Sequence, residues 1–496
     1  MAGDAAMPEP AVQALLHAAR LRVVAGTLAQ LLVMLALLSA VPAVVALGLG
    51  SIALAQRLGV MAAMLCVFGF LLLRLPGLDL RRIDLQWNEA LAVTALAFLL
   101  AAAAMVWPLT AAGIEPLDAL LESVSAVTTT GLTVLRGLET TDPAVLFLRA
   151  WMQWYGGLGI AVLTAALIMR HHTGARRLLE STGEHLTSAG ARQHARTVFA
   201  VYAGLTLLAV AAVWAAGVAP FDALLYALSA AATGGFAPAD ASLAGLPLAA
   251  VGVLTAVCAL AAVSLPLYAR VPTRGLAILW RDEEVRMLVA VVLLAALALT
   301  LIGRWQQGLD WPEALGHGLA LGVSAQTDTG FSTTAIAALP AAALLVLMLS
   351  MTIGGCTGST AGGLKIVRLL VVLRLVQLAL RRTAVAERAV LNARIDDERV
   401  EQDMITSALQ LLTLWLAVLL LSWLVFLLHG APPLPGLFEV VSATANAGLS
   451  AGLTGPALAP ALKAVLIADM LFGRVEIIAM LVLFYPPTWI GRRRKT

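Results

Sequence analysis

The chain has 496 residues, of which 61% are hydrophobic and only 12% are charged, and its mean hydropathy is +0.92. A soluble core cannot bury this much apolar surface while leaving so little polar area for water, so a soluble protein is excluded. The 32 basic and 29 acidic residues give a net charge of +3, too balanced for a nucleic-acid-binding protein. The three widely spaced cysteines, Cys66, Cys258 and Cys356, exclude a disulfide framework and a CxxC metal site.

Apolar runs predict the membrane spans in chain order, since a span needs about 20 apolar residues. Ten runs are long enough, at 23–48, 55–75, 88–110, 144–169, 197–218, 245–268, 286–303, 339–378, 404–429 and 460–486. Four further apolar runs are too short to span, and each starts at or just after a proline, which suits the first turn of a helix. They predict re-entrant helices at 115–127, 220–232, 312–326 and 435–445, beginning near Pro116, Pro220, Pro312 and Pro435.

Basic residues gather in alternate connections between these runs. The clusters lie near residues 20–22, 81–82, 170–196, 270–286, 381–399 and 492–495. The positive-inside bias then places both termini in the cytoplasm, and the re-entrant helices enter from the opposite side.

One motif recurs at the end of all four short runs. The stretches 125–132, 229–236, 324–331 and 442–449 all fit Ser-Ala-x-x-x-x-Gly-(Leu/Phe). A single copy would be explained by the preference of close helix packing for small residues. Four copies with the same internal spacing, each between two spans, indicate a repeated architecture instead.

The repeated motif predicts an ion pore. Irregular backbone is tolerated at membrane depth only where protein buries it or water lines it, and rings of carbonyl oxygens can replace the hydration shell of a cation. Glycine allows the φ values that such a backbone needs, and the C-terminal ends of the short helices favour a cation. No Arg or Lys lies in the four motifs. The predicted filter residues are Thr128, Thr129, Thr130, Gly131, Ala232, Thr233, Gly234, Gly235, Thr327, Asp328, Thr329, Gly330, Ala445, Asn446, Ala447 and Gly448.

The run at 339–378 is too long for one span, and residues 354–363 contain five glycines. Each glycine costs a helix about 1 kcal/mol relative to alanine, so we expect two half-helices joined by a loop. A phosphate-binding loop is excluded, because the stretch from Gly358 to Lys365 lacks the contiguous Gly-Lys-(Ser/Thr).

The sequence resembles the potassium transporter superfamily that includes bacterial Trk and Ktr and plant HKT proteins, and most closely its TrkH-type branch. Besides the four motifs, the resemblance rests on the stretches Trp151 to Ile160, Ile353 to Lys365 and Gly473 to Ile477. It implies that Gly131, Gly235, Gly330 and Gly448 line a potassium site. Since serine in place of the first glycine accompanies sodium preference in some plant members, Gly131 implies potassium.

The resemblance also implies a gate and partners. The glycine-rich break becomes an intramembrane gate loop beneath the filter, with Arg474 as a positive barrier to cations. The implied gate residues are Gly354, Gly355, Gly358, Gly362, Gly363, Lys365 and Arg474. Lys365 has a second interpretation, snorkelling to the cytoplasmic interface. Related transporters are homodimers that sit on cytoplasmic nucleotide-binding subunits of the TrkA or KtrA type, for which the basic stretches 170–196 and 381–399 are candidate docking surfaces.

Several acidic residues allow more than one interpretation. Asp328 either concentrates cations at the pore mouth or points sideways into a hydrogen bond, and we expect the second. Glu122 and Glu439, each nine residues before a filter glycine, are expected to brace the loops by hydrogen bonds. The acidic stretch 396–398 is expected to be a solvated charged helix rather than a metal site, because Arg394 and Arg399 flank it.

The expected fold class is therefore an all-α polytopic membrane protein with four span–pore loop–span repeats around a central pore, plus two N-terminal spans. The expected divisions are the N-terminal pair (1–87), repeat 1 (88–170), repeat 2 (197–270), repeat 3 (284–378, with gate loop 354–363) and repeat 4 (404–488).

The expected function is potassium uptake across the bacterial inner membrane through a gated, channel-like pore. Whether potassium uptake is coupled to protons or sodium, as in a symport, stays open. The transported K⁺ is the expected ion, with no organic cofactor in this chain and no nucleic-acid partner, only membrane lipid and the protein partners above. The alternative is a lipid-modifying membrane enzyme. Such an enzyme would need several acidic residues or histidines that converge at one depth in the bilayer, and the sequence lacks such a cluster. We therefore expect that the protein is not an enzyme.

Overall fold

The computed structural model describes residues 18–74, 85–171, 188–384, 393–396 and 398–490. The chain divides into two compact units: Met1–Ala104 with Val475–Thr496 (unit 1), and Met105–Arg474 (unit 2). Several residues of the basic clusters, and one of the acidic stretch 396–398, lie outside the described ranges: Arg81, Arg82, Arg176, Arg177, Arg388, Asp397, Arg492, Arg493, Arg494 and Lys495.

Unit 1 contains the two predicted N-terminal spans. Helices α2 (Leu21–Gly48) and α3 (Ile52–Leu73) are joined by a tight turn in which Gly50 has a φ of 82°. They pack closely, since a side chain on Gly69 of α3 would meet Val33 of α2. The start of α4 (Trp87–Leu109) and the C-terminal elements α21 (Ile477–Phe484) and η4 (Pro486–Thr488) complete the unit.

An ion pair fixes the start of α2 to α4 within unit 1. The Arg20 Nε and Nη2 donate to the two carboxylate oxygens of Glu89 at 2.8 and 2.9 Å, and the Arg20 amide adds a third bond at 2.8 Å. Glu89 has no exposed surface. Next to Arg20, the Ala19 amide donates to the carbonyl of Thr488 in η4, which connects the C-terminal elements of unit 1 to the start of α2.

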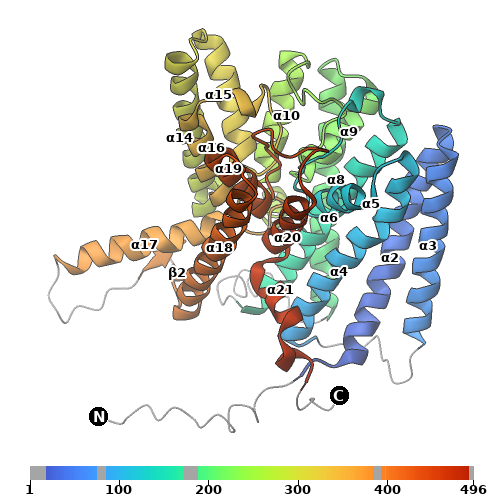
Figure 1. Ribbon diagram of the computed structural model, residues 1–496. Coiled ribbons are helices and arrows are strands. Elements are labelled where there is room, and N and C mark those ends of the chain that lie inside the picture. The colour runs from blue at the N-terminus through green and yellow to red at the C-terminus, as the bar shows by residue number, and fades with distance from the viewer. Residues whose placement is uncertain (1–17, 75–84, 172–187, 385–392, 397, 491–496) are drawn as a thin grey trace, which may run out of the picture. The chain divides into compact units, whose positions relative to one another are not determined.

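From α4 onward, whose residues 105–109 belong to unit 2, the described chain repeats one pattern, a long helix followed by a short helix, a loop and a further helix (Figure 1). The first long helix is α4 in repeat 1 and then α8 (Ser188–Ala215), α14 (Glu283–Gln306) and α18 (Gln402–Leu428). The short helices are α5 (Pro116–Val127), α9 (Pro220–Ala231), α15 (Trp311–Gln326) and α19 (Pro433–Ala445). The closing helices are α6 (Pro143–His171), α10 (Leu248–Ala261), α16 (Ala341–Ile353) and α20 (Pro460–Val475). Single 3₁₀ turns are η1 (Thr110–Ala112), η2 (Leu138–Thr140) and η3 (Ile336–Ala338).

Three of the four short helices begin at or one residue before the predicted prolines, and the fourth, α19, begins at Pro433, two residues before the predicted Pro435. Pro116 and Pro220 are the first residues of α5 and α9, and Pro312 is the second residue of α15, positions at which the missing N–H has no intrahelical partner to lose. In repeat 3 the short helix packs tightly on its long helix, because Gly318 and Gly322 bring the backbone of α15 against Thr300 and Ala296 of α14.

The predicted break of the run 339–378 is confirmed. Helix α16 ends at Ile353, and α17 (Ile366–Arg382) starts only after a loop of residues 354–365, which we call the glycine loop. In Figure 1, α17 extends away from the rest of unit 2, next to strand β2.

Two other predicted spans were wrong as continuous helices. The run 245–268 is divided into α10 and the short helix α11 (Leu265–Tyr268), and the short helices α12 (Val271–Arg274) and α13 (Ala277–Arg281) follow it. Pro266 and Pro272 lack the amide that would continue a helix. The run 460–486 is divided into α20 and α21 at Glu476, whose φ of 64° interrupts the helical hydrogen bonds.

Among the described residues, six helices are long and apolar enough to cross a membrane, and they correspond to six of the ten predicted spans. They are Leu21–Gly48, Ile52–Leu73, Trp87–Ala112, Ala195–Ala215, Glu283–Gln306 and Gln402–Leu428. The helices α10 and α16 are apolar but shorter.

The prediction of a charged helix around residues 396–398 was wrong. Strands β1 (Arg394–Ile395) and β2 (Glu398–Arg399) form a small antiparallel hairpin. Asp396, with a φ of 49°, lies in its turn, a conformation that aspartate tolerates and a helix does not.

The Arg20–Glu89 pair gives a test of unit 1. Replacing Glu89 by Gln leaves the Arg20 guanidinium largely buried without its counter-charge, so we expect the protein to lose on the order of 3 kcal/mol of stability. The measurement is the midpoint of thermal unfolding in detergent, followed by tryptophan fluorescence. The control is E313Q, whose parent carboxylate is 56% exposed and should leave the midpoint unchanged. Equal midpoints for E89Q and the parent would contradict the assignment.

Candidate functional site

The four repeated motifs form one kind of helix end. Two hydrogen bonds close each end: the amide two residues before the glycine donates to the carbonyl of the motif alanine, and the next amide donates to the carbonyl of the motif serine. This is the Schellman arrangement, which requires a left-handed residue just beyond the helix. The left-handed residues are Thr129, Thr233, Asp328 and Asn446, with φ between 51° and 57°. The Ser-Ala dipeptide therefore marks the carbonyls that accept the capping bonds.

After these caps come loop 1 (128–131), loop 2 (232–235), loop 3 (327–330) and loop 4 (445–448), each ending in the motif glycine. All four glycines have positive φ, from 76° to 92°. Such values suit glycine and strain other residues. Threonine rarely adopts the left-handed conformation, so Thr129 and Thr233 add strain of the kind that persists at functional sites.

The four loops make a closed ring. A side chain on Gly131 would overlap the carbonyl oxygen of Gly234 in loop 2. The same close approach repeats around the ring, from Gly235 to the Thr329 oxygen, from Gly330 to the Ala447 oxygen and from Gly448 back to the Thr130 oxygen. Each glycine thus lies against the residue that precedes the glycine of the next loop, and the fourth contact returns to the first loop.

A glutamine from α6 supports the junction between loops 1 and 2. The Gln153 Nε2 donates to the Gly234 carbonyl at 2.5 Å, and its Oε1 accepts from the Ser229 hydroxyl at 2.7 Å and the Phe236 amide at 3.3 Å. Gln153 belongs to the Trp-x-Gln-Trp stretch of the sequence, so the stretch holds the neighbouring loop in place.

Loop 4 is tied to loop 1 and to α20 by its own left-handed residue. The Asn446 Nδ2 donates to the Thr130 hydroxyl at 2.9 Å and to the Met470 carbonyl at 2.8 Å. Gly473 permits this approach, since a side chain there would meet Asn446 Oδ1 and the Thr444 carbonyl.

The prediction that Glu122 braces the loops is confirmed. Its Oε1 accepts from the Thr133 hydroxyl at 2.6 Å and from the Val134 amide at 2.7 Å, directly after loop 1. Its Oε2 accepts from Arg149 Nε at 3.0 Å. Arg149 is only 1% exposed and its guanidinium lies 3.9 Å from the centre of the Phe236 ring, beside loop 2.

Glu439 repeats the brace after loop 4, as predicted. It accepts from Ser450 Oγ at 2.7 Å, from the Leu453 amide at 3.1 Å and from Thr454 Oγ1 at 2.5 Å. At the equivalent position of repeat 2, the Tyr226 hydroxyl donates to the Ser242 carbonyl. Arg149 was not among the residues that the sequence singled out; a charged residue inside the apolar run 144–169 is the signal that could identify it.

The glycine loop lies against the C-terminal ends of the short helices. The Gly363 amide donates to the Ala445 carbonyl at 2.9 Å, and the Gly354 carbonyl accepts from Gln326 Nε2 at 2.6 Å. The Thr360 hydroxyl contacts the Ala231 carbonyl at 3.1 Å. The loop therefore contacts the ends of α9, α15 and α19, on the side of the ring from which the four loops start.

Arg474 of α20 holds the middle of the glycine loop. The Arg474 Nη1 donates to the Thr360 carbonyl at 2.9 Å, and the residue is 4% exposed. Its Nε and Nη2 have no hydrogen-bond partner among the described residues. Lys365 has a φ of 74° at the start of α17 and its ammonium donates to the Ala361 carbonyl.

Two of the predicted gate glycines face a different neighbour. Gly355 packs near the Ala262 carbonyl, and the Gly358 carbonyl accepts from the Leu265 amide at 3.1 Å, so both lie toward the break after α10. Gly354, Gly362 and Gly363 lie nearer the ring; a side chain on Gly362 would overlap the Ala445 carbonyl.

The glycine loop is also anchored at the start of α14. The Thr357 amide donates to Glu284 Oε2 at 2.6 Å. The preceding residue, Glu283, accepts from Arg374 Nη2 of α17 at 3.0 Å, and the Glu283 amide donates to Asp396 Oδ1 in the β-hairpin at 3.0 Å. Adjacent residues of α14 thus connect the loop with α17 and the hairpin.

The expectation that Asp328 points into a hydrogen bond was wrong. The residue is fully buried, and neither carboxylate oxygen has a hydrogen-bond partner in the part of the chain that the structure describes. Its Oδ2 faces the glycine loop, because a Cβ on Gly354 would lie 2.9 Å from it. The other interpretation, a charge that concentrates cations at the pore mouth, stays a prediction; Asp328 lies at the glycine-loop end of loop 3.

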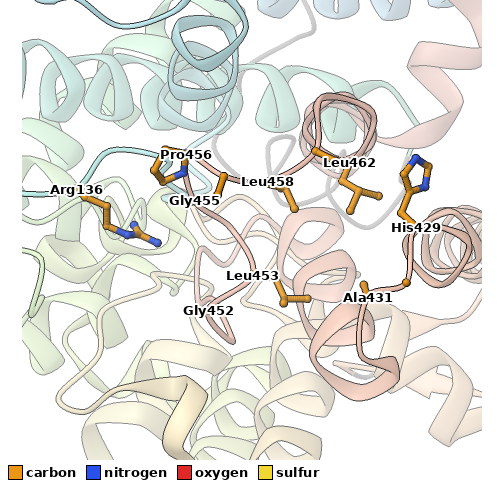
Figure 2. Close-up of a pocket in the computed structure, with 12 residues that line it drawn as sticks. Arg136, His429, Ala431, Gly452, Leu453, Gly455, Pro456, Leu458 and Leu462 are labelled. Atoms are coloured by element: carbon orange, nitrogen blue, oxygen red, sulfur yellow. The ribbon is translucent and has the colours of Figure 1, made fainter.

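A separate cavity of about 480 Å³ lies elsewhere in unit 2 (Figure 2). Arg136 and His429 flank it on opposite sides, and Leu458 and Leu462 lie between them. The Arg136 Nη2 already donates to the Thr454 carbonyl at 2.7 Å, and no residue of loops 1–4 lines the cavity. It is therefore not part of the ring.

The described residues contain no group of three or more His, Cys, Asp or Glu side chains that could hold a metal ion.

Comparison with known proteins places this geometry in a family. Residues 93–488 match the family described as TrkH, a cation transport protein. The chain is 30% identical over 383 residues to the Trk system potassium uptake protein TrkH of Salmonella typhimurium, covering 75% of this chain and 79% of that protein. It is 27% identical over 421 residues to an uncharacterized cation transporter of Methanocaldococcus jannaschii, covering 84% and 86% of the two chains. The crystal structure of the potassium transporter TrkH from Vibrio parahaemolyticus superimposes with a TM-score of 0.85 at 28% identity, covering 95% of this chain and all of that one. The chain belongs to the TrkH family of cation transport proteins.

Proposed function

We propose that this protein is the potassium-translocating subunit of a potassium uptake system and that K⁺ passes through the ring of loops 1–4. The closed ring is the observation that carries the proposal, since four equivalent loops enclose one axis. Two of the similar proteins described above are named as a potassium uptake protein and a potassium transporter of the TrkH type.

The selectivity filter consists of the sixteen residues of loops 1–4. Potassium loses its hydration shell to oxygens of these loops, and the bracing by Gln153, Glu122 and Glu439 keeps the ring at a fixed size. Binding by neutral oxygens is strong enough to replace water and weak enough to release the ion. The Gly234 oxygen is engaged by Gln153, so in loop 2 the neighbouring carbonyls carry more of the contact.

The glycine loop is the gate beneath this filter. It crosses the side of the ring from which the loops start, and Arg474 adds a positive charge there while bonding to the loop. Opening requires the loop to leave the ends of α9, α15 and α19, and glycines at positive φ give it the freedom to rearrange.

The assembly follows from the same assignment. The protein is a homodimer in the bacterial inner membrane with both termini in the cytoplasm, and a nucleotide-binding subunit of the TrkA or KtrA type controls the gate. The described parts of the basic stretches 170–196 and 381–399 are candidate contacts for that subunit; residues 172–187, 385–392 and 397 lie outside the described ranges. Transport through this pore is either passive or coupled to protons or sodium. Measuring rubidium uptake under an imposed pH or sodium gradient distinguishes coupled transport from passive flow.

Gly131→Ser tests the filter. The added side chain would overlap the Gly234 carbonyl and would strain a residue at φ 92°, so the ring must deform. We expect potassium and rubidium flux into liposomes to fall by about tenfold or more, since strain of this kind costs about 1–3 kcal/mol, while the ratio of sodium to potassium flux rises. Gly245→Ser is the matched control, because nothing lies within 4 Å of a side chain at that glycine. Unchanged flux and selectivity in Gly131→Ser would exclude loop 1 from the ion path.

Arg474→Ala tests the gate. The substitution removes the bond to the Thr360 carbonyl and the positive charge together. A hydrogen bond to a charged group contributes about 1.5–3 kcal/mol, so we expect rubidium flux through the protein alone to rise by about tenfold or more. Arg474→Lys retains the charge and should stay close to the parent. If the alanine variant conducts no faster than the parent, Arg474 is not part of the barrier.

A further inference from the structure

Asp328 carries the one formal charge in loops 1–4, and nothing in the described structure compensates it directly. Its side chain is fully buried, with both carboxylate oxygens lacking a hydrogen-bond donor. A buried ionised carboxylate without a partner costs several kcal/mol, so such a group requires an explanation, and an ion or water held there is one.

The neighbouring polar groups are committed to other partners. The hydroxyls of Thr327 and Thr329, on either side of Asp328, bond to each other at 2.7 Å. The Gln326 Nε2 donates to the Gly354 carbonyl instead. The carboxylate therefore receives no solvation from the side chains adjacent to it in the chain.

Two cationic groups act on Asp328 electrostatically without bonding to it. They are Lys365 and Arg474, which donate to the Ala361 and Thr360 carbonyls of the glycine loop. Among the described residues, no nitrogen of Lys365 or Arg474 lies within 4.0 Å of an Asp328 carboxylate oxygen as an ion pair. A cation that passes between the filter and the glycine loop consequently meets two cationic side chains and one carboxylate that is hydrogen-bonded to neither.

The equivalent positions in the other loops are neutral. They hold Thr129, Thr233 and Asn446 in the same left-handed conformation. Asn446 uses its amide to donate two hydrogen bonds, which a carboxylate cannot do. The charge at Asp328 is therefore not needed to form the cap, because threonine and asparagine form the same cap in this chain.

From these contacts we infer that Asp328 binds the permeating monovalent cation on the glycine-loop side of the filter. The bare carboxylate supplies the oxygen ligands and offsets the repulsion from Arg474 and Lys365. This inner cation site rests on the proposed function and adds to it a second binding position outside the ring of backbone oxygens.

The experiment measures the concentration dependence of radioactive rubidium uptake into liposomes that contain the purified full-length protein. Asp328→Asn and Asp328→Thr place at this position the residues that the other loops already accept, so both variants should fold, as size-exclusion chromatography checks. We expect both to need at least about tenfold more rubidium for half-maximal uptake, because the attraction of one unit charge is lost; at about 4 Å and an effective dielectric constant near 20 that attraction would amount to about a thousandfold. Glu313→Gln removes a charge from the exposed start of the same helix and should leave the curve unchanged.

A second pair of proteins separates direct binding from an effect through the gate arginine. The comparison is Arg474→Ala with the double variant Arg474→Ala, Asp328→Asn. A carboxylate that binds the cation itself retains its effect in this background. The inference is overturned if the loss of affinity disappears there, or if both Asp328 variants match the parent while the parent transports rubidium. Absence of rubidium transport by the parent would instead contradict the proposed function.

Discussion

The contact between each loop glycine and a carbonyl oxygen of the next loop is the constraint on which this structure depends. Four such contacts close the ring, and each leaves no room for a Cβ atom. The Schellman caps set the direction in which each loop leaves its helix, because a left-handed residue is required two positions before the glycine. The motif spacing is therefore the number of residues between the serine and alanine, whose carbonyls accept the capping bonds, and the glycine, which contacts the neighbouring loop.

The ring is connected to the rest of unit 2 on both sides. On the side after the loops, buried acids hold the chain, with Glu122 paired to Arg149. On the side before the loops, the glycine loop bonds to the helix ends and to Arg474. That loop in turn is bonded to Glu284, whose neighbour Glu283 contacts α17 and the β-hairpin. Two adjacent residues of α14 therefore connect the glycine loop with α17 and with the hairpin.

Much of this architecture follows from local patterns in the chain. Prolines at the start of the short helices, the fourfold motif and the five glycines of 354–363 all act within a few residues, so the sequence predicts them directly. The break after α10, the hairpin around Asp396 and the pairing of Arg149 with Glu122 depend on tertiary contacts. For Asp328 the sequence suggests a hydrogen bond, because a buried acid usually finds one. The donors near it bond to backbone carbonyls and to each other instead, which only the packed structure reveals.

The central claim is that loops 1–4 surround a single ion path. Crystals grown in rubidium in place of potassium test it most directly, since rubidium scatters anomalously and its position can be located without reference to the protein. The account predicts an anomalous peak on the axis of the ring, within coordination distance of oxygens from all four loops. Rubidium bound only outside the ring, in crystals whose ring is closed as described, would contradict it.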